Sequence, residues 1–402
     1  MPLNHIVCCD GTNNAFGAQN TNVIRLIQAL DRNPEKQRVC YDPGVGTLPD
    51  PLLWNPISWI KAKVWRFADL AIGWGLEQNV LEAYSYLMDH WSAGDRVFLF
   101  GFSRGAYTVR VLAGMLHTLG LVPRGGYNLL PYVMNLYKSI RNQEDGETSR
   151  YWRLCREFRE TFSREAGPER RFPIHFLGVW DTVSSYGWFF NPTSFPHTAS
   201  NPSCVTIRHA IAIDERRAFF RQNLFHKAAP QDLRERWFPG VHSDVGGGYQ
   251  LSEGGLWRPA FEWMLEEATE QGLLVNQERL DRVLGGDRLP KAWLEPKHES
   301  LTPRWWPAEF VPKKSGRHYC VNRFQPRAIP DGSWFHRAAV LRLRDDPSYR
   351  PKNVTSEFVD FVRALIEVPA AVQFHRDPPA DEPPIPHGTK PQIPCAPEEK
   401  ST

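Results

Sequence analysis

A serine lies between two glycines in the pentapeptide Gly-Phe-Ser-Arg-Gly at residues 101–105, directly after the strand-like run 95–100. Small and apolar side chains follow at helical spacing over residues 106–116. A serine at a tight turn from strand to helix adopts a strained backbone and projects its Oγ above the sheet. The flanking glycines are needed because a Cβ there would collide with neighbouring backbone. The pattern therefore predicts that Ser103 is a nucleophile for acyl transfer.

A serine hydroxyl needs a base within hydrogen-bond reach and a third group that holds the base in the right tautomer. An apolar strand predicted at 172–180 ends at Asp181, and a second at 236–241 leads into His242 and a glycine-rich loop. The chain order serine, acid, histidine, with each residue at a strand end, is that of α/β-hydrolases. We predict that His242 takes the proton of Ser103 and later hands it to the leaving alcohol, while Asp181 orients His242.

Other histidines and acids compete for the roles of base and acid. His5 precedes the apolar run 6–9 of the first predicted strand and His175 lies within another strand. Four others lack both a strand end and neighbouring glycines: His209, His226, His336 and His375. Asp214 and Asp244 are alternatives to Asp181 as the acid. Asp244 follows the predicted base too closely in sequence to be an easy partner, so we interpret it as a residue that orders the loop.

The oxyanion of a tetrahedral intermediate needs preorganised hydrogen-bond donors. The residue after the nucleophile normally supplies one backbone N–H, which here is that of Arg104. We expect the second donor from the loop after the first strand. Gly11 and Thr12 are the candidates, since a glycine lets the backbone approach the substrate closely. The alternative is that this loop is a turn required only for packing.

Strand and helix patterns alternate through the first half of the chain, which is typical of a parallel sheet covered by helices on both faces. Strands are predicted at 3–9, 37–41 and 95–100, and helices at 22–30, 76–91, 127–165 and 259–271. Asn20 or Thr21 is the expected cap of the first helix. The sequence therefore predicts a mostly parallel α/β-hydrolase-like fold that forms one domain over residues 1–375.

Three regions depart from this alternation. Residues 48–75 hold four tryptophans among lysines, and their charges break the apolar run, so we expect no transmembrane helix. This insertion is a candidate lid that makes peripheral contact with lipid, and the alternative is a helix packed on the core. Residues from about 291 to 375 predict an irregular C-terminal wrap. The proline-rich, charged residues 376–402 predict a disordered tail.

Composition limits the classes of function. A chain of 402 residues with 42% hydrophobic and 23% charged residues can build a large core. Its net charge of +3 gives no electrostatic case for nucleic acid. Seven cysteines without a C-x-x-C pair predict free thiols and a reducing compartment. The first residues run straight into a strand, so we expect no signal peptide and a chain that is cytoplasmic as synthesised.

Two other hydrolase classes fit the sequence less well. The Asp-Gly-Thr at residues 10–12 is similar to the D-x-D-G-T loop of haloacid-dehalogenase-type phosphatases, but Cys8 stands where their nucleophilic aspartate would be. A metal hydrolase built on Asp10, His242 and Asp244 lacks the tight spacing of metal-binding histidines. We therefore expect neither a metal nor another cofactor. A binding protein that keeps a hydrolase fold without turnover is a further alternative.

Several stretches of the chain resemble the DUF2235 family of α/β-hydrolases, which includes the Tle1-like phospholipase effectors of bacterial type VI secretion. They lie at residues 9–14, 41–47, 73–76, 101–106, 179–183, 241–249 and 349–354. The resemblance implies a serine hydrolase with Ser103, Asp181 and His242 as its triad. For secreted members it also implies phospholipid deacylation, export by type VI secretion, and a secretion-apparatus or immunity partner. An esterase for small soluble esters is the alternative.

Overall fold

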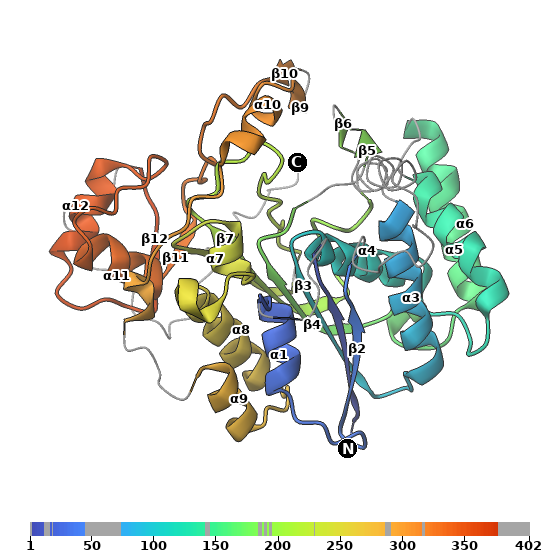
Figure 1. Ribbon diagram of the computed structural model, residues 1–402. Coiled ribbons are helices and arrows are strands. Elements are labelled where there is room, and N and C mark those ends of the chain that lie inside the picture. The colour runs from blue at the N-terminus through green and yellow to red at the C-terminus, as the bar shows by residue number, and fades with distance from the viewer. Residues whose placement is uncertain are drawn as a thin grey trace, which may run out of the picture.

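The computed structural model of the chain describes residues 2–376 except 12–16, 18, 45–73, 141–144, 184–186, 189–190, 193–194, 229, 286–290 and 316–317. Within these residues, eight strands form one sheet in the order β2-β1-β3-β4-β7-β8-β11-β12 (Figure 1). Neighbouring strands are parallel from β2 to β11, and β12 is antiparallel at the edge. The strands are β1 (Asn4–Cys9), β2 (Gln37–Asp42), β3 (Arg96–Phe102), β4 (Ile174–Trp180), β7 (Cys204–Ala212), β8 (Asp232–Phe238), β11 (Trp334–His336) and β12 (Ala371–Gln373).

Helices cover both faces of this sheet (Figure 1). One face carries α3 (Trp74–His90), α4 (Arg104–Leu119), α5 (Leu130–Ser139) and α6 (Asp145–Phe162). The other carries α1 (Asn22–Ala29), α8 (Arg258–Glu270) and α9 (Gln277–Val283). This arrangement confirms the predicted α/β class with a mostly parallel sheet. The predicted cap of the first helix is also confirmed, because the Thr21 side chain accepts the Ile24 N–H.

Strand β1 illustrates how the sequence builds two cores. Ile6 and Cys8 pack with the helices of one face, whereas Val7 and Cys9 pack with those of the other. Successive side chains of a strand point to opposite faces, so a strand covered on both sides is mostly apolar. The whole of β1 is buried. Its two polar side chains are hydrogen-bonded, Asn4 to the carbonyl of Gly272 at 2.8 Å and His5 to the carboxylate of Asp95 at 3.1 Å.

The direction of the strand order reverses between β1 and β3. The chain passes from β1 outward to the edge strand β2 and then returns to β3 on the other side of β1. Loops that leave neighbouring strands in opposite directions part from each other at such a point, which is where open α/β sheets bind their ligands. Ser103 follows β3 and Gly11 follows β1, so both candidate residues lie at this edge.

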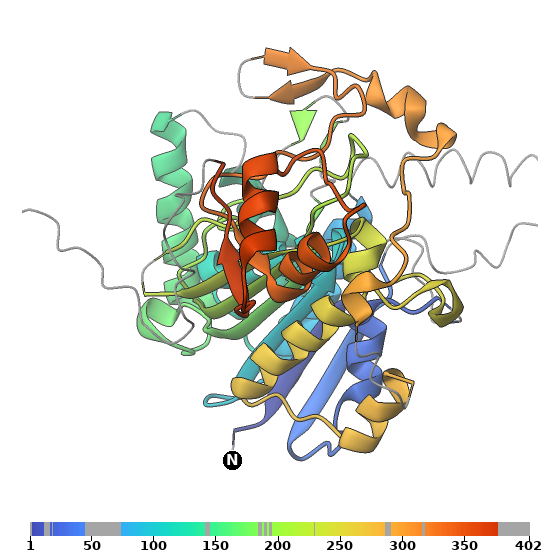
Figure 2. The same cartoon turned by 90° about the vertical axis from the view of Figure 1, so that its left-hand side faces the viewer.

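The C-terminal region is more regular than the sequence predicts. Helices α11 (Arg337–Asp345) and α12 (Ser356–Ala364) join β11 and β12 within the expected irregular wrap, and Figure 2 views this red unit from in front. This region holds the third apolar core of the protein, which includes Phe335, whose ring packs on Phe358 and Phe374. Strands of three residues show too little alternation to be recognised from sequence. They form because tertiary contacts override weak local propensity.

Shorter elements lie above the carboxyl ends of the parallel strands in Figure 1. They are the helix α10 (Trp306–Glu309) and two hairpins, β5 (Gly187–Trp188) with β6 (Asn191–Pro192) and β9 (Lys313–Ser315) with β10 (His318–Cys320). None of the described helices is both long enough and apolar enough to cross a membrane. Of the predicted tail, residues 377–402 lie outside the described residues.

Candidate active site

Ser103 occupies the turn between β3 and α4. Its backbone angles, a φ of 58° and a ψ of −121°, lie in a region that residues other than glycine rarely adopt. Its hydroxyl makes no capping bond to the helix. The turn is tight, because a Cβ on Gly101 would lie 2.5 Å from the carbonyl oxygen of Gly105. A Cβ on Gly105 would lie 2.1 Å from the carbonyl oxygen of Cys9. This is the geometry of a nucleophile elbow pressed against the end of β1.

We expect Gly105→Ala to lower the free energy of unfolding by about 3 kcal/mol, because the new Cβ meets fixed backbone of β1 rather than a side chain that can turn away. Denaturant unfolding followed by tryptophan fluorescence measures the change. Gly125→Ala is the control. Gly125 has a φ of 74° with no atom within 4 Å of an added Cβ, so it isolates the left-handed backbone, worth about 1 kcal/mol. Equal losses would contradict close packing of the elbow.

Asp181 and His242 form a hydrogen-bonded pair beside the elbow. Asp181 follows the last residue of β4, and His242 begins the short helix α7 (His242–Gly246), which comes after β8. Nδ1 of His242 lies 2.5 Å from Oδ2 of Asp181, and both side chains are buried. Because Nδ1 is engaged, Nε2 is the ring nitrogen left for a hydroxyl or a substrate. The pair has the geometry of a base and its orienting acid.

Ser103 lies next to this pair. Its N–H donates to the carbonyl of the residue before Asp181 at 3.1 Å, and its own carbonyl accepts the N–H of Val183 at 3.2 Å. The Ser103 backbone is therefore hydrogen-bonded to the chain both before and after Asp181. The ring of Phe102, the residue before the serine, lies 4.6 Å from the imidazole of His242. The structure thus gathers all three residues of the predicted triad at the carboxyl edge of the sheet.

Burial and charge determine the protonation of the acid and the base. Burial alone would raise the pKa of Asp181, but the charge of Arg327 and the hydrogen bond from His242 outweigh it and hold that pKa well below its ordinary value. Burial lowers the pKa of His242, although its hydrogen bond with Asp181 and the charge of that carboxylate oppose the shift. At neutral pH Asp181 is therefore ionised and His242 is neutral, the states in which a histidine can accept a proton from a serine.

Arg327 holds the other side of the carboxylate, and the sequence analysis does not single it out. Its guanidinium contacts Oδ1 and Oδ2 of Asp181 at 2.6 and 2.9 Å, and both side chains are buried. Arg327 lies in the segment between β10 and β11, which shows no periodic pattern. No local signal distinguishes it among the 48 lysine and arginine residues of the chain.

Glu215 and Phe220 are two further neighbours of His242 that sequence reasoning missed. The carboxylate of Glu215 accepts the backbone N–H of His242 at 3.2 Å. Burial would raise the pKa of Glu215, but the hydrogen bond from Arg217 and its charge lower it to about 2. The ring of Phe220 lies edge-on to the imidazole at 4.8 Å. His242 therefore contacts two phenyl rings, Phe102 and Phe220, which keep water from its faces.

The predicted oxyanion donors differ in whether their backbone N–H groups are already hydrogen-bonded. Arg104 is the first residue of α4, so its backbone N–H has no acceptor within the helix and lies at the positive end of the helix dipole. The N–H of Gly11 donates to Oδ1 of Asp10 at 2.8 Å, and it must leave that bond to serve an oxyanion. Thr12 lies outside the described residues.

The alternative acids are engaged elsewhere. Asp214 accepts the N–H of Gly240 at 2.7 Å and the hydroxyl of Tyr349 at 2.8 Å. Asp244 pairs with Nδ1 of His298 at 2.6 Å. These contacts tie the carboxylates to the loop before α7 and to the C-terminal region. Among the described residues, neither carboxylate is hydrogen-bonded to the imidazole of His242, which Asp181 holds.

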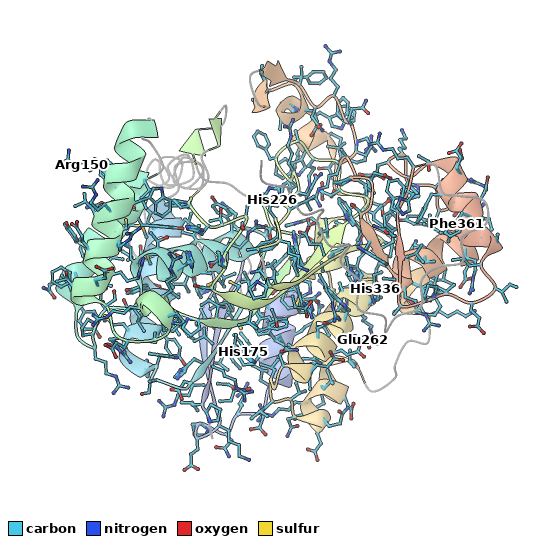
Figure 3. The ribbon with its side chains drawn as sticks, turned by 180° about the vertical axis from the view of Figure 1, so that it is seen from behind. Arg150, His175, His226, Glu262, His336 and Phe361 are labelled. Atoms are coloured by element: carbon cyan, nitrogen blue, oxygen red, sulfur yellow. The ribbon has the colours of Figure 1, made fainter. Side chains whose placement is uncertain are left out.

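Three of the histidines weighed as alternative bases are labelled in Figure 3, where they lie apart from one another. His175 on β4 contacts the carbonyl of Gln271 at 2.9 Å. His336 at the end of β11 stacks on Phe238, with the ring centroids 4.4 Å apart. His226 is exposed. None of these contacts pairs the imidazole with a carboxylate.

Two sequence predictions meet the limits of the described residues. The candidate lid at 48–75 lies outside them except for its last two residues, which open α3. Across the described part of the chain, no group of three or more His, Cys, Asp and Glu side chains is arranged to hold a metal ion.

The family model "T6SS, Phospholipase effector Tle1-like, catalytic domain" matches residues 4–267. The uncharacterized protein YEL023C of Saccharomyces cerevisiae is 32% identical over 226 residues, which are 55% of this chain and 32% of that protein.

Two solved structures resemble the chain weakly. An uncharacterized protein from Pseudomonas aeruginosa has a TM-score of 0.41 and 20% identity, covering 69% of this chain and 47% of that one. The Tle1 effector bound to the VgrG spike of the type VI secretion system has a TM-score of 0.30 and 18% identity, covering 62% and 52%. The chain thus spans between about a third and a half of the length of the proteins it matches.

Proposed function

The chain belongs to the Tle1-like catalytic domain family of type VI secretion phospholipase effectors, and from this premise we propose that it is a serine hydrolase of lipid esters. One observation carries the proposal: a serine in a strained elbow lies beside a buried histidine that is hydrogen-bonded at 2.5 Å to a carboxylate. This set of groups suits acyl transfer, and its parts are Ser103, His242 and Asp181.

The proposed reaction proceeds through an acyl-enzyme. Nε2 of His242 takes the hydroxyl proton of Ser103 as Oγ attacks the ester carbonyl, and the N–H of Arg104 stabilises the oxyanion. His242 then gives the proton to the leaving alcohol, and the acyl group stays on Ser103. Water, deprotonated by the same nitrogen, releases the fatty acid and restores the serine. Asp181 keeps its negative charge throughout and stabilises the imidazolium.

A product analysis on lipids tests the substrate class. Vesicles of a defined phospholipid should yield free fatty acid and lysophospholipid, and a short-chain soluble ester should be cleaved more slowly. The tryptophan-rich residues 48–75 motivate this preference, since such a segment suits an aqueous-lipid interface. Equal rates on dispersed and aggregated substrate would favour a soluble esterase. Absence of any product, together with no labelling by a fluorophosphonate, would favour a binding protein.

We expect the acid limb of kcat/KM to have an apparent pKa below 6.5, because burial shifts the pKa of His242 downward from that value. The sign follows from the role of a base: activity is full above the pKa of His242 and falls as the pH drops through it. Initial rates on a short soluble ester, measured across the range in which the fold is intact by circular dichroism, give the limb. An acid limb centred above 6.5 would contradict a buried imidazole as the base.

The family also motivates a proposal about a partner. The Tle1 effector among the compared structures is bound to a VgrG spike. We propose that this chain is likewise exported by type VI secretion and binds a spike protein of the same class. We also propose that an immunity protein binds it in the producing cell. Pull-down of the tagged chain with a candidate spike protein tests the first interaction, and failure to retain it at micromolar concentrations would count against the proposal.

A further inference from the structure

We propose that Arg327 is a positioning residue of the active site: its guanidinium fixes the carboxylate of Asp181 and the loop around Phe220 against His242. The inference rests on the proposed function for the role of that pair. Arg327 lies 60 residues beyond the end of the region matched by the family model, which is residue 267. The C-terminal part of the chain would therefore complete the catalytic site.

The carboxylate of Asp181 accepts four hydrogen bonds from three residues. Oδ1 accepts the backbone N–H of Ala212 at 2.9 Å and an N–H of Arg327 at 2.6 Å. Oδ2 accepts Nδ1–H of His242 at 2.5 Å and a second N–H of Arg327 at 2.9 Å. Two parallel bonds from a planar guanidinium fix the plane of a carboxylate, which a single bond does not. The fork therefore determines where Oδ2 meets the histidine.

Arg327 is itself held by the fold. Its Nε donates to the carbonyl of Phe220 at 2.8 Å, a second donor bonds the same carbonyl, and another reaches the carbonyl of Ala212 at 3.3 Å. With the two bonds to Asp181, all five guanidinium N–H groups are used. The backbone carbonyl of Arg327 accepts the side-chain amide of Asn353, 3.0 Å away. A side chain with every donor satisfied has one orientation available, as a positioning residue needs.

Through its hydrogen bonds to Phe220, Arg327 also holds a ring that packs against His242. Phe220 presents its carbonyl to Arg327 and its ring to the imidazole of His242, 4.8 Å away. The guanidinium of Arg217 covers the same ring at 3.5 Å. Loss of the Arg327 bonds would free the Phe220 backbone, and the ring would no longer shield His242 from water.

The charge of Arg327 also bears on the base. The titratable and charged groups that face His242 are Asp181, Glu215 and Arg217, and His209 stands beside Asp181. A carboxylate alone stabilises an imidazolium, but a carboxylate paired with a fixed guanidinium does so less, because the positive charge beyond the carboxylate partly offsets its negative charge at the ring. With Arg327 in place His242 stays neutral to lower pH. Without it, the imidazolium becomes easier to form.

Two substitutions separate these effects. Arg327→Met removes both the charge and the two parallel bonds to the carboxylate. We expect the acid limb of kcat/KM for a soluble nitrophenyl ester to move to higher pH by about one unit. We also expect kcat to fall at least tenfold. Arg327→Lys keeps a charge but not the fork, so it should return the acid limb toward the wild-type position while leaving kcat low. Arg216→Met is the matched control. Arg216 ties the same loop to the carbonyl of Phe324 at 3.1 Å without touching the carboxylate, and it should leave both readouts unchanged.

Titration of His242 by NMR of histidine-labelled protein, assigned with His242→Gln, gives a readout that needs no turnover. A higher titration midpoint in folded Arg327→Met supports the proposal. An unchanged midpoint and an unchanged acid limb would overturn it, and so would full recovery of kcat in Arg327→Lys. If wild-type protein cleaves no ester, the proposed function fails, whereas the NMR titration still tests what Arg327 does. If Arg327→Met does not fold, Arg327→Lys carries the test through kcat and the midpoint.

Discussion

The variant Ser103→Ala is expected to lose ester hydrolysis by ~10⁴- to 10⁶-fold, the range seen when the nucleophile of a working triad is removed. The fold should persist, because the Ser103 hydroxyl makes no capping bond and the strained backbone of the elbow is enforced by its neighbours. Alanine at a φ of 58° keeps the same strain, so the change removes one oxygen and little else. Release of fatty acid from phospholipid vesicles measures the loss.

Covalent labelling gives a second measure of the same variant. A fluorophosphonate should add one phosphonyl group to the wild-type chain, located at Ser103 by peptide mass, and none to Ser103→Ala. Ser252→Ala is the matched control, because Ser252 is an exposed serine in the short 3₁₀ helix that follows α7. It should label and turn over as the wild type does. Equal labelling of Ser103→Ala and wild type would remove the serine mechanism from consideration.

The parts of the site that the sequence predicted share one property. Ser103, Asp181 and His242 each follow a strand whose apolar run can be read from a few consecutive residues. Carboxyl ends of parallel strands meet at one edge, so local patterns were enough to predict that these three residues gather there. The α/β class and the first helix cap were predictable for the same reason, because propensity, periodicity and capping act over a few residues.

The parts that were missed depend on contacts between distant segments. Arg327 reaches Asp181 across 146 positions of sequence, and Glu215 reaches the His242 backbone across 27. Neither contact leaves a periodicity or a spacing rule. The strands β11 and β12 were missed for a related reason: each has three residues, and they join the sheet because Phe335 finds a core to pack against. Contacts of this kind are decided by the assembled fold.

The second large effect is expected for Asp181→Asn, which should lower kcat by ~10⁴-fold because an amide stabilises the wrong tautomer of the histidine. Here the substitution should also destabilise the chain by about 3–5 kcal/mol, since it leaves the Arg327 guanidinium buried without its counter-charge. A triad aspartate without such a partner would show the first loss and less of the second. Denaturant unfolding and ester turnover, measured on the same preparation, separate the two.

A double variant, Asp181→Asn with Arg327→Met, distinguishes the stability effect from the chemical one. Removing both partners replaces an unpaired buried charge with an apolar side chain of similar length, so most of the lost unfolding free energy should return. Activity should stay low, because the amide still directs the imidazole to the wrong tautomer. Two outcomes would contradict this account. If the double variant is as unstable as Asp181→Asn, the buried charge is not what destabilises it, and if turnover returns, the carboxylate is not what orients His242.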